Sequence, residues 1–224
     1  MYVIIHEEKR KCVLDMYMNP AELMERFIKD NPELISISDV LQDIFKTIES
    51  CFESGGKLLL CGNGGSAADC DHIVGELMKG FLLKRPVPDE FCNHPALKGE
   101  GKLLQGALPA ISLVSQNALS TAYANDVEAD MIFAQLVYGL GKTGDVLMGI
   151  STSGNARNIC HALRVARAAG MKTIGLTGKS GGDMRPLCDY CLCVPADETY
   201  RIQEYHLPVY HTLCAMLEAA FFSA

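Results

Sequence analysis

The apolar residues between Pro20 and Ser54 recur every three or four positions, which is the period of an amphipathic helix. Asn31 and Pro32 interrupt this pattern. Proline cannot continue a helix freely, and it restricts the residue before it as well. The pattern therefore predicts either two helices or one helix that bends at Asn31-Pro32.

Beyond this stretch, short apolar runs alternate with segments of helical period. Strands separated by helices favour right-handed crossovers and a parallel sheet that is covered on both faces. We therefore expect an α/β fold with a doubly wound, five-stranded parallel sheet in three αβα layers and additional N- and C-terminal helices. The predicted strands are 57–61, 107–114, 145–150, 172–177 and 190–194, and the predicted helices lie near 66–79, 127–140, 155–169 and 199–222.

Residues 80–107 are the exception, because they are rich in proline, glycine and charge and have no steady period. Such a segment is longer than an ordinary connection between a helix and a strand, and it is typical of a functional or mobile loop. We expect residues 1–18 to form an N-terminal extension. Residues 19–224 are then long enough for a single α/β domain with one sizeable core.

Charge and hydropathy narrow the class of protein. No uncharged apolar run approaches the roughly 18 residues that a membrane span requires. The first fifteen residues carry clustered charge where a signal peptide would be apolar. The net charge of −7 disfavours a nucleic-acid surface, which needs a basic stripe. We therefore expect a cytoplasmic protein that acts on small molecules, without a membrane or nucleic-acid partner.

Ten cysteines occur in the chain, and three of them form a C-x-x-C-x-C pattern at Cys188, Cys191 and Cys193. This spacing suits half of a zinc site or a redox pair. No second pair stands at a zinc-finger spacing, and the segment is typical of a short buried strand. Packing of reduced cysteines in the core is therefore the favoured interpretation.

The segment CGNGGSAADCDHIVGEL, residues 61–77, admits two interpretations. Its glycines fit a dinucleotide fingerprint, whereas His72 and Glu76 are spaced as two metal ligands on one face of a helix. The dinucleotide site needs an acidic residue about 20 positions further on, at the end of the next strand. Here the next predicted strand begins only at residue 107 and ends without an acid, so the dinucleotide interpretation is disfavoured.

Three predicted strands run into loops of one chemical kind, at residues 62–66, 151–155 and 177–182. Ligands of such sheets lie beyond the carboxyl ends of the strands. Glycines let the backbone approach a ligand, and the N–H groups of a following helix can bind an anion. A plain turn explains residues 177–182 alone equally well. The three loops together favour a phosphorylated ligand, and their hydroxyl groups suit a sugar phosphate.

Five segments extend this picture: residues 61–77, AND at 124–126, GISTSGNARN at 149–158, GLTGKSGG at 175–182 and RIQEYHLPVYH at 201–211. In this order they resemble the phosphoheptose isomerase branch of the sugar isomerase (SIS) domain family, over about residues 35–222. The resemblance implies a zinc-assisted aldose–ketose isomerase that converts sedoheptulose 7-phosphate to D-glycero-D-manno-heptose 7-phosphate. It also implies a homotetramer with active sites between subunits.

The resemblance also assigns roles to individual residues. It implies that Glu76 and His211 are the catalytic acid/base pair. The residues that it implies for substrate and phosphate binding are Asn63, Gly64, Gly65, Ser66, Asp126, Ser151, Thr152, Ser153, Asn155 and Gln203. The implied zinc ligands are His72, Glu76, Gln203 and His211.

These residue types suit the reaction. Moving a carbonyl from C2 to C1 through an enediol needs one group that removes a proton and one that returns it. On a helix, His72 and Glu76 have Cβ atoms about 6 Å apart and can reach one ion. Gln203 and His211 are about 12 Å apart along a straight helix, so one ion shared by both requires a bend, for example at Pro208, or a second subunit.

Some positions leave alternatives open. His206 is either a ligand or a packed core histidine, and packing is favoured. Ala156, Tyr200 and Gly80 depart from the family pattern, and these differences bear on heptose specificity. The rival hypotheses are an isomerase of another sugar phosphate and a non-catalytic SIS protein that binds a sugar phosphate or a protein partner such as a replication initiator. The second rival predicts eroded acid/base and metal positions, whereas all four are filled.

Overall fold

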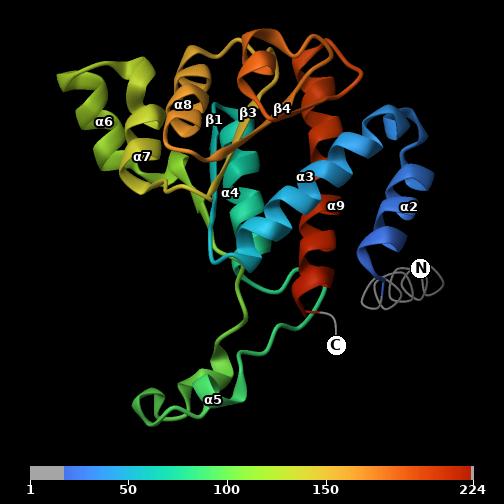
Figure 1. Cartoon of the computed structure of the whole chain (residues 1–224), viewed down its shortest axis with the longest axis vertical. Coiled ribbons are helices and arrows are strands. Elements are labelled where there is room, and N and C mark those ends of the chain that lie inside the picture. The colour runs from blue at the N-terminus through green and yellow to red at the C-terminus, as the bar shows by residue number, and fades with distance from the viewer. Residues whose placement is uncertain (1–17, 223–224) are drawn as a thin grey trace, which may run out of the picture.

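The computed structural model describes residues 18–222, so the expected N-terminal extension lies almost wholly outside the described residues. It contains one five-stranded sheet in which every neighbouring pair is parallel, with strand order β2-β1-β3-β4-β5 (Figure 1). The predicted doubly wound α/β fold is confirmed. The strands are β1 (Leu58–Gly62), β2 (Ala110–Ser112), β3 (Val146–Ser151), β4 (Lys172–Thr177) and β5 (Tyr190–Cys193).

Helices cover both faces of the sheet. Alternate residues of β1 and β3 point into two separate apolar cores, and both strands are buried throughout. One core is closed by α2, α3, α4 and α9, and the other by α7 and α8. The helices are α2 (Pro20–Asp30), α3 (Ser38–Glu53), α4 (Gly65–Met78), α6 (Asn117–Asp126), α7 (Ile132–Leu140), α8 (Arg157–Ala168) and α9 (Thr199–Phe222). No helix among residues 18–222 is long and apolar enough to cross a membrane.

The N-terminal stretch forms two helices, which is one of the two predicted forms. Asn19 and Glu22 form a reciprocal capping box at the start of α2, and Pro20 occupies the first turn. The helix ends at Asp30, and Pro32 opens the 3₁₀ helix η1 (Pro32–Ile37) that leads into α3. The interruption seen in the sequence pattern is therefore a true helix boundary.

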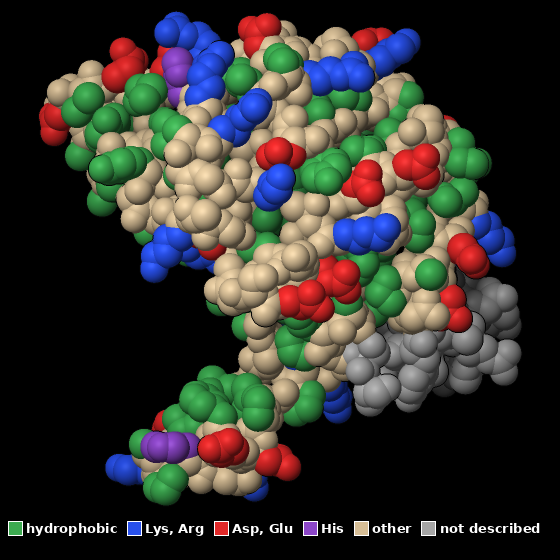
Figure 2. Space-filling view, in the orientation of Figure 1, with side chains coloured by type: hydrophobic (Ala, Val, Ile, Leu, Met, Phe, Trp, Pro, Cys, Tyr) green, Lys and Arg blue, Asp and Glu red, His purple; other side chains and the backbone are tan. Residues whose placement is uncertain are grey.

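The segment expected to be an irregular loop, residues 80–107, contains three short helical turns: α5 (Asp89–Cys92), η2 (Pro95–Leu97) and η3 (Glu100–Leu103). A bridge between Pro86 and Gln105 closes its base. The segment projects from the body as an arm (Figure 1), and apolar side chains gather on its surface (Figure 2). Leu103 is 84% exposed. The long connection expected here is thus a projecting arm that contains short helical turns (Figure 1).

Two boundaries near the arm also differ from the prediction. The strand expected over 107–114 is confined to β2, because Leu113 begins the 3₁₀ turn η4 (Leu113–Ser115). Helix α6 follows and was not predicted. None of its residues is buried, and its sequence therefore lacks the apolar period from which a helix is predicted. The helix expected over 127–140 begins as the 3₁₀ turn η5 (Ala129–Met131), which leads into α7.

A fully buried ion pair joins the arm to the body. Glu218 of α9 accepts hydrogen bonds from the backbone N–H groups of residues 81–83 and from Nε of Arg85, the last at 2.6 Å. The other guanidinium nitrogens of Arg85 donate to the carbonyl oxygens of Leu77 and Glu76. These carbonyls belong to the last turn of α4, where no following N–H group of the helix is available to donate to them. The pair therefore fixes the end of α4 against α9.

His206 lies in the core between α9 and the sheet, which agrees with the favoured packing interpretation. Its side chain is fully buried, and its interaction with the backbone of Thr177 opposes the effect of burial on its pKa only in part. Burial disfavours the imidazolium ion and lowers the pKa of His206 to about 4. His206 is therefore neutral at pH 7.

Replacing Glu218 by Gln should strongly destabilise the fold, because it leaves the buried guanidinium of Arg85 without a countercharge. We expect the free energy of unfolding to fall by about 3–5 kcal/mol in urea titrations followed by circular dichroism. The matched change Glu204→Gln removes an exposed pair with Arg201 on the same helix and should cost less than about 1 kcal/mol. Equal losses in the two variants would contradict a special role for Glu218.

Acidification should destabilise the protein through His206. The folded pKa lies below the unfolded value of about 6.5, so the unfolded state binds more protons and stability falls as the pH drops from 6.5 toward 4. At pH 5 this contribution is about 2 kcal/mol relative to pH 7.5. Urea unfolding gives the free energy of unfolding at pH 7.5 and at pH 5. The difference between these two values should be about 2 kcal/mol smaller in His206→Gln than in the wild type, and unchanged in His161→Gln. An unchanged difference in His206→Gln would refute the assignment.

Candidate active site

The loops after β1 and β3 meet at the carboxyl edge of the sheet, as expected for parallel strands. Asn63 in the first loop and Asn158 in the first turn of α8 exchange two side-chain hydrogen bonds, of 3.0 Å and 2.9 Å. The amide pair ties the β1 loop to the start of α8. Asn158 was not among the predicted site residues, since its partner lies 95 positions away in the sequence.

The loop after β3 can receive an anion. Ala156 is the N-cap of the twelve-residue helix α8 and offers no side-chain acceptor, while Oδ1 of Asn158 accepts the N–H of Ile159 in the first turn at 3.0 Å. Alanine is among the poorest N-cap residues, so the terminal N–H groups are not satisfied by a side chain of the cap. The hydroxyl of Ser153 stands beside this end, where its Oγ accepts the N–H of Asn155 at 3.1 Å. Backbone and hydroxyl donors here together suit a phosphate group.

The third glycine-rich loop supports the second. Residues 178–182 lead into a six-residue 3₁₀ helix, η6 (Gly182–Leu187). The N–H of Met184 donates to Gly154, and that of Asp183 donates to the side chain of Asn155. A Cβ on Gly154 would lie 2.2 Å from the carbonyl oxygen of Gly181. This close contact requires glycine at position 154, and it fixes the conformation of the loop at residues 151–155.

Gln203 of α9 reaches the beginning of α4. A Cβ on Gly65 would lie 2.3 Å from Nε2 of Gln203, so only glycine permits this approach. Gly64 precedes it with a φ of 56°, a conformation that favours glycine. Gln203 therefore stands beside the β1 loop, with the residues predicted to bind the substrate.

Three of the predicted acid/base and metal residues converge where α4 packs on α9. Nε2 of His72 lies 3.3 Å from Oε1 of Glu76 and 3.4 Å from Nε2 of His211. The side chain of Glu76 is 14% exposed and that of His72 is 43% exposed, so the cluster faces solvent on one side. His72 thus forms the centre of a group with two nitrogen donors and one carboxylate.

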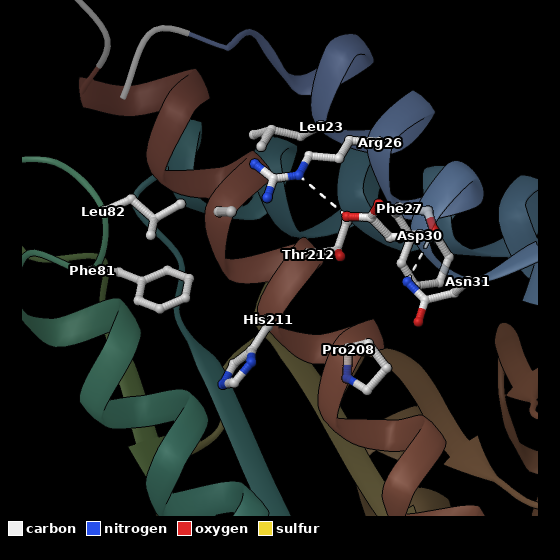
Figure 3. Close-up of a pocket in the computed structure, with 11 residues that line it drawn as sticks. Leu23, Arg26, Phe27, Asp30, Asn31, Phe81, Leu82, Pro208, His211 and Thr212 are labelled. Atoms are coloured by element: carbon white, nitrogen blue, oxygen red, sulfur yellow. Dashed lines mark hydrogen bonds and ion pairs between the residues drawn. The ribbon is translucent and has the colours of Figure 1, made fainter. Parts of the chain in front are cut away.

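A groove of about 360 Å³ opens beside His211 (Figure 3). Its walls come from α2, α9 and the start of the arm, with Phe81 and Leu82 on one side and Phe27 on the other. The ring of Phe81 lies 5.6 Å from that of His211. The acid/base cluster therefore lies at the edge of a partly apolar hollow that can admit a ligand.

Burial tunes the protonation of His211. Its pKa is lowered chiefly by desolvation and further by the neighbouring His72, while Glu76 partly opposes the shift. The imidazole of His211 is therefore neutral at pH 7 and can accept a proton. This is the state that a general base requires.

Two residues that the sequence analysis missed support the cluster. The hydroxyl of Tyr210 lies 3.0 Å from Nδ1 of His72 and 3.3 Å from Oδ1 of Asp69. Asp69 stands three residues before His72 on α4, which places both on one helix face, and this spacing was the available signal. Burial raises the pKa of Asp69, and the hydrogen bond from Tyr210 and the charge of His72 oppose the shift.

Two predicted site residues lie apart from this cluster. Helix α9 continues through Pro208, so Gln203 stays about 12 Å from His211 along the axis and contacts Gly65 instead. Asp126 is exposed at the end of α6, where its carboxylate accepts a hydrogen bond from Asn125. The described chain thus brings together His72, Glu76 and His211, but neither Gln203 nor Asp126 joins them.

The donor set fits zinc in its pairwise spacing. Ligands about 2.0–2.2 Å from a tetrahedral zinc lie about 3.3–3.5 Å from one another. The distances from His72 to Glu76 and to His211 match this edge length. Within residues 18–222, however, no three His, Cys, Asp or Glu side chains already form a complete metal site. Completing one requires side-chain rearrangement.

Gly80, one of the departures from the family pattern, has a steric reason. A Cβ at this position would lie 2.5 Å from the carbonyl oxygen of Leu83, and the N–H of Gly80 donates to Gln105 at the base of the arm. The chain turns tightly here so that residues 81–83 can reach Glu218. Glycine at position 80 therefore allows the tight turn with which the arm begins.

Comparisons with known proteins identify the family of the chain. The family model of the SIS domain matches residues 96–178. The phosphoheptose isomerase of Roseiflexus sp. (strain RS-1) is 41% identical over 213 residues, which cover 95% of this chain and 94% of the relative. That of Maridesulfovibrio salexigens is 40% identical over 187 residues, which cover 84% and 82% of the two chains.

Solved structures show the same relationship. A phosphoheptose isomerase from Francisella tularensis matches with a TM-score of 0.70 and 33% identity, covering 86% of this chain and 93% of the other. The phosphoheptose isomerase from Neisseria gonorrhoeae matches with a TM-score of 0.69 and 31% identity, covering 87% and 92%. The chain belongs to the phosphoheptose isomerase family of SIS-domain enzymes.

Proposed function

We propose that this protein is a sugar-phosphate isomerase that converts sedoheptulose 7-phosphate to D-glycero-D-manno-heptose 7-phosphate. The observation that carries the proposal is the approach of Glu76 and His211 to the same nitrogen of His72, at 3.3 Å and 3.4 Å. The names of the relatives point to the same substrate. The anion-binding loop after β3 supports a phosphorylated ligand.

In this proposal the phosphate binds at residues 151–155, where hydroxyls and the N-terminus of α8 supply donors. The sugar lies along the β1 loop, residues 63–66, with Gln203 beside it. Asp126 keeps its proposed contact with the sugar only if a second copy of the chain completes the site. The place of Asp126 at the exposed end of α6, a helix that lies apart from α4 and α9 (Figure 1), supports our proposal of a homotetramer with active sites between subunits.

The reaction proceeds in two steps, and each step removes one proton from the sugar and adds another. A proton leaves C1 of the ketose while O2 gains one, which gives the enediol; O1 then releases a proton while C2 gains one, which gives the aldose. Glu76 and the neutral His211 are the groups that can carry these protons. Phe81 and the wall of α2 exclude part of the solvent from His211, which limits the loss of protons to water.

We further propose that His72, Glu76 and His211 bind Zn²⁺, with Gln203 reaching it only after a rearrangement. When bound, the ion would polarise the carbonyl and hydroxyl oxygens of the sugar. The support is the pairwise donor spacing and the chemistry of two imidazoles with one carboxylate.

Purified protein incubated with sedoheptulose 7-phosphate should produce an aldoheptose 7-phosphate, detected by chromatography against a mass-matched standard. Glu76→Gln and His211→Ala should each lower kcat by about 10²–10⁴-fold, because each removes a proton carrier. Glu204→Gln, an exposed change on the same helix as His211, should retain wild-type turnover. A folded, zinc-loaded protein without turnover would refute the heptose assignment and favour another sugar phosphate or a binding role.

Zinc should co-purify with the chain and be required for turnover. We expect dialysis against a chelator to abolish activity, and added Zn²⁺ to restore it. His72→Ala should reduce the zinc content measured by elemental mass spectrometry, while His161→Ala should leave it unchanged. Full turnover by protein shown to be free of metal would overturn the zinc proposal.

A further inference from the structure

Tyr210 links the acid/base cluster to the half-buried carboxylate of Asp69. The side chain is 1% exposed, and its hydroxyl lies between Nδ1 of His72, at 3.0 Å, and Oδ1 of Asp69, at 3.3 Å. The other carboxylate oxygen of Asp69 is buried without a hydrogen-bond partner among the described residues. Tyr210 is therefore the group that connects Asp69 to His72.

The number of protons determines the direction of these hydrogen bonds. A tyrosine hydroxyl has one proton to donate, and an ionised carboxylate can only accept. Tyr210 therefore donates to Asp69 and must accept from His72. This requires a proton on Nδ1 of His72.

The opposite nitrogen of His72 then carries a lone pair in the neutral ring. That nitrogen, Nε2, faces the carboxylate of Glu76 at 3.3 Å and Nε2 of His211 at 3.4 Å. A lone pair that faces a carboxylate is stable only when a positively polarised atom lies between them. A proton or a metal ion meets this condition, so the arrangement is prepared for a cation.

We infer that Tyr210, held by Asp69, is a positioning residue that selects the Nδ1–H tautomer of His72 and aims its Nε2 lone pair at Glu76 and His211. A hydrogen bond on one ring nitrogen generally decides which nitrogen is free to bind a metal or a proton. The importance of this device for turnover rests on the proposed function. The tautomer itself does not.

Tyr210→Phe isolates the hydroxyl from the rest of the side chain. The Tyr210 ring packs edge-on against the rings of His72 and His211, with centroids 5.5 Å and 4.9 Å away. Phenylalanine keeps these contacts and removes the oxygen alone. Tyr205→Phe is the matched control. It also removes a tyrosine hydroxyl from α9, one that accepts a hydrogen bond from Arg201 and does not contact His72.

Nitrogen-15 NMR of histidine-labelled, metal-free protein tests the tautomer directly, with the His72 signals assigned by their loss in His72→Gln. We expect a protonated Nδ1 in the wild-type protein and in Tyr205→Phe, and a shift toward protonated Nε2 in Tyr210→Phe. Asp69→Ala should give the same shift, because it frees the Tyr210 hydroxyl to donate to Nδ1. Protonated Nε2 in the wild-type protein, or no change in Tyr210→Phe, would overturn the inference whether or not the protein is an isomerase.

Competition with a chromogenic chelator tests the consequence for metal binding. Loss of a group that orients a ligand histidine typically lowers metal affinity about 10–100-fold. We expect this loss for zinc in Tyr210→Phe, together with a lower kcat at unchanged KM, and wild-type values in Tyr205→Phe. The expected tautomer and affinity changes in a protein without heptose turnover would uphold the inference and refute only the proposed function. Equal zinc affinity in Tyr210→Phe and wild type would overturn the role in metal binding.

Discussion

The buried ion pair between Arg85 and Glu218 is the constraint on which the site depends. Charges removed from water are costly unless good geometry and further hydrogen bonds compensate them. Here the carboxylate accepts from residues 81–83 as well as from Arg85, and the guanidinium also donates to two carbonyls of α4. One of these carbonyls is that of Glu76 itself, so the pair fixes the backbone of a proposed catalytic residue against the helix that carries His211.

The two parts of the site are built on different principles. The proposed anion-binding part uses backbone groups and short hydroxyls at the sheet edge, and its shape is set by glycine contacts such as that between Gly154 and Gly181. The acid/base part uses side chains on two packed helices. Gln203 against Gly65 lies where the two parts meet. A sugar phosphate suits this division, because its charged end and its reacting end require different chemistry.

Much of the fold could be predicted because its strands are buried on both faces and therefore appear as continuous apolar runs. Helix α6 could not, since it buries no residue and has no apolar period. The i, i+4 spacing identified His72 and Glu76 from local sequence alone. Arg85 and Glu218 carry no such signal, because they are 133 positions apart and each looks like an ordinary surface charge until the fold brings them together.

The geometry of α9 bears on how many ligands a single chain can offer a metal. The helix runs unbroken through Pro208, so Gln203 and His211 face different parts of the site rather than one ion. Catalytic zinc sites commonly take three protein ligands and leave a position for water or substrate. His72, Glu76 and His211 are three donors of suitable type. In the proposed function Gln203, which lies at the β1 loop against Gly65, would then bind the sugar, and one sequence motif would serve two adjacent tasks.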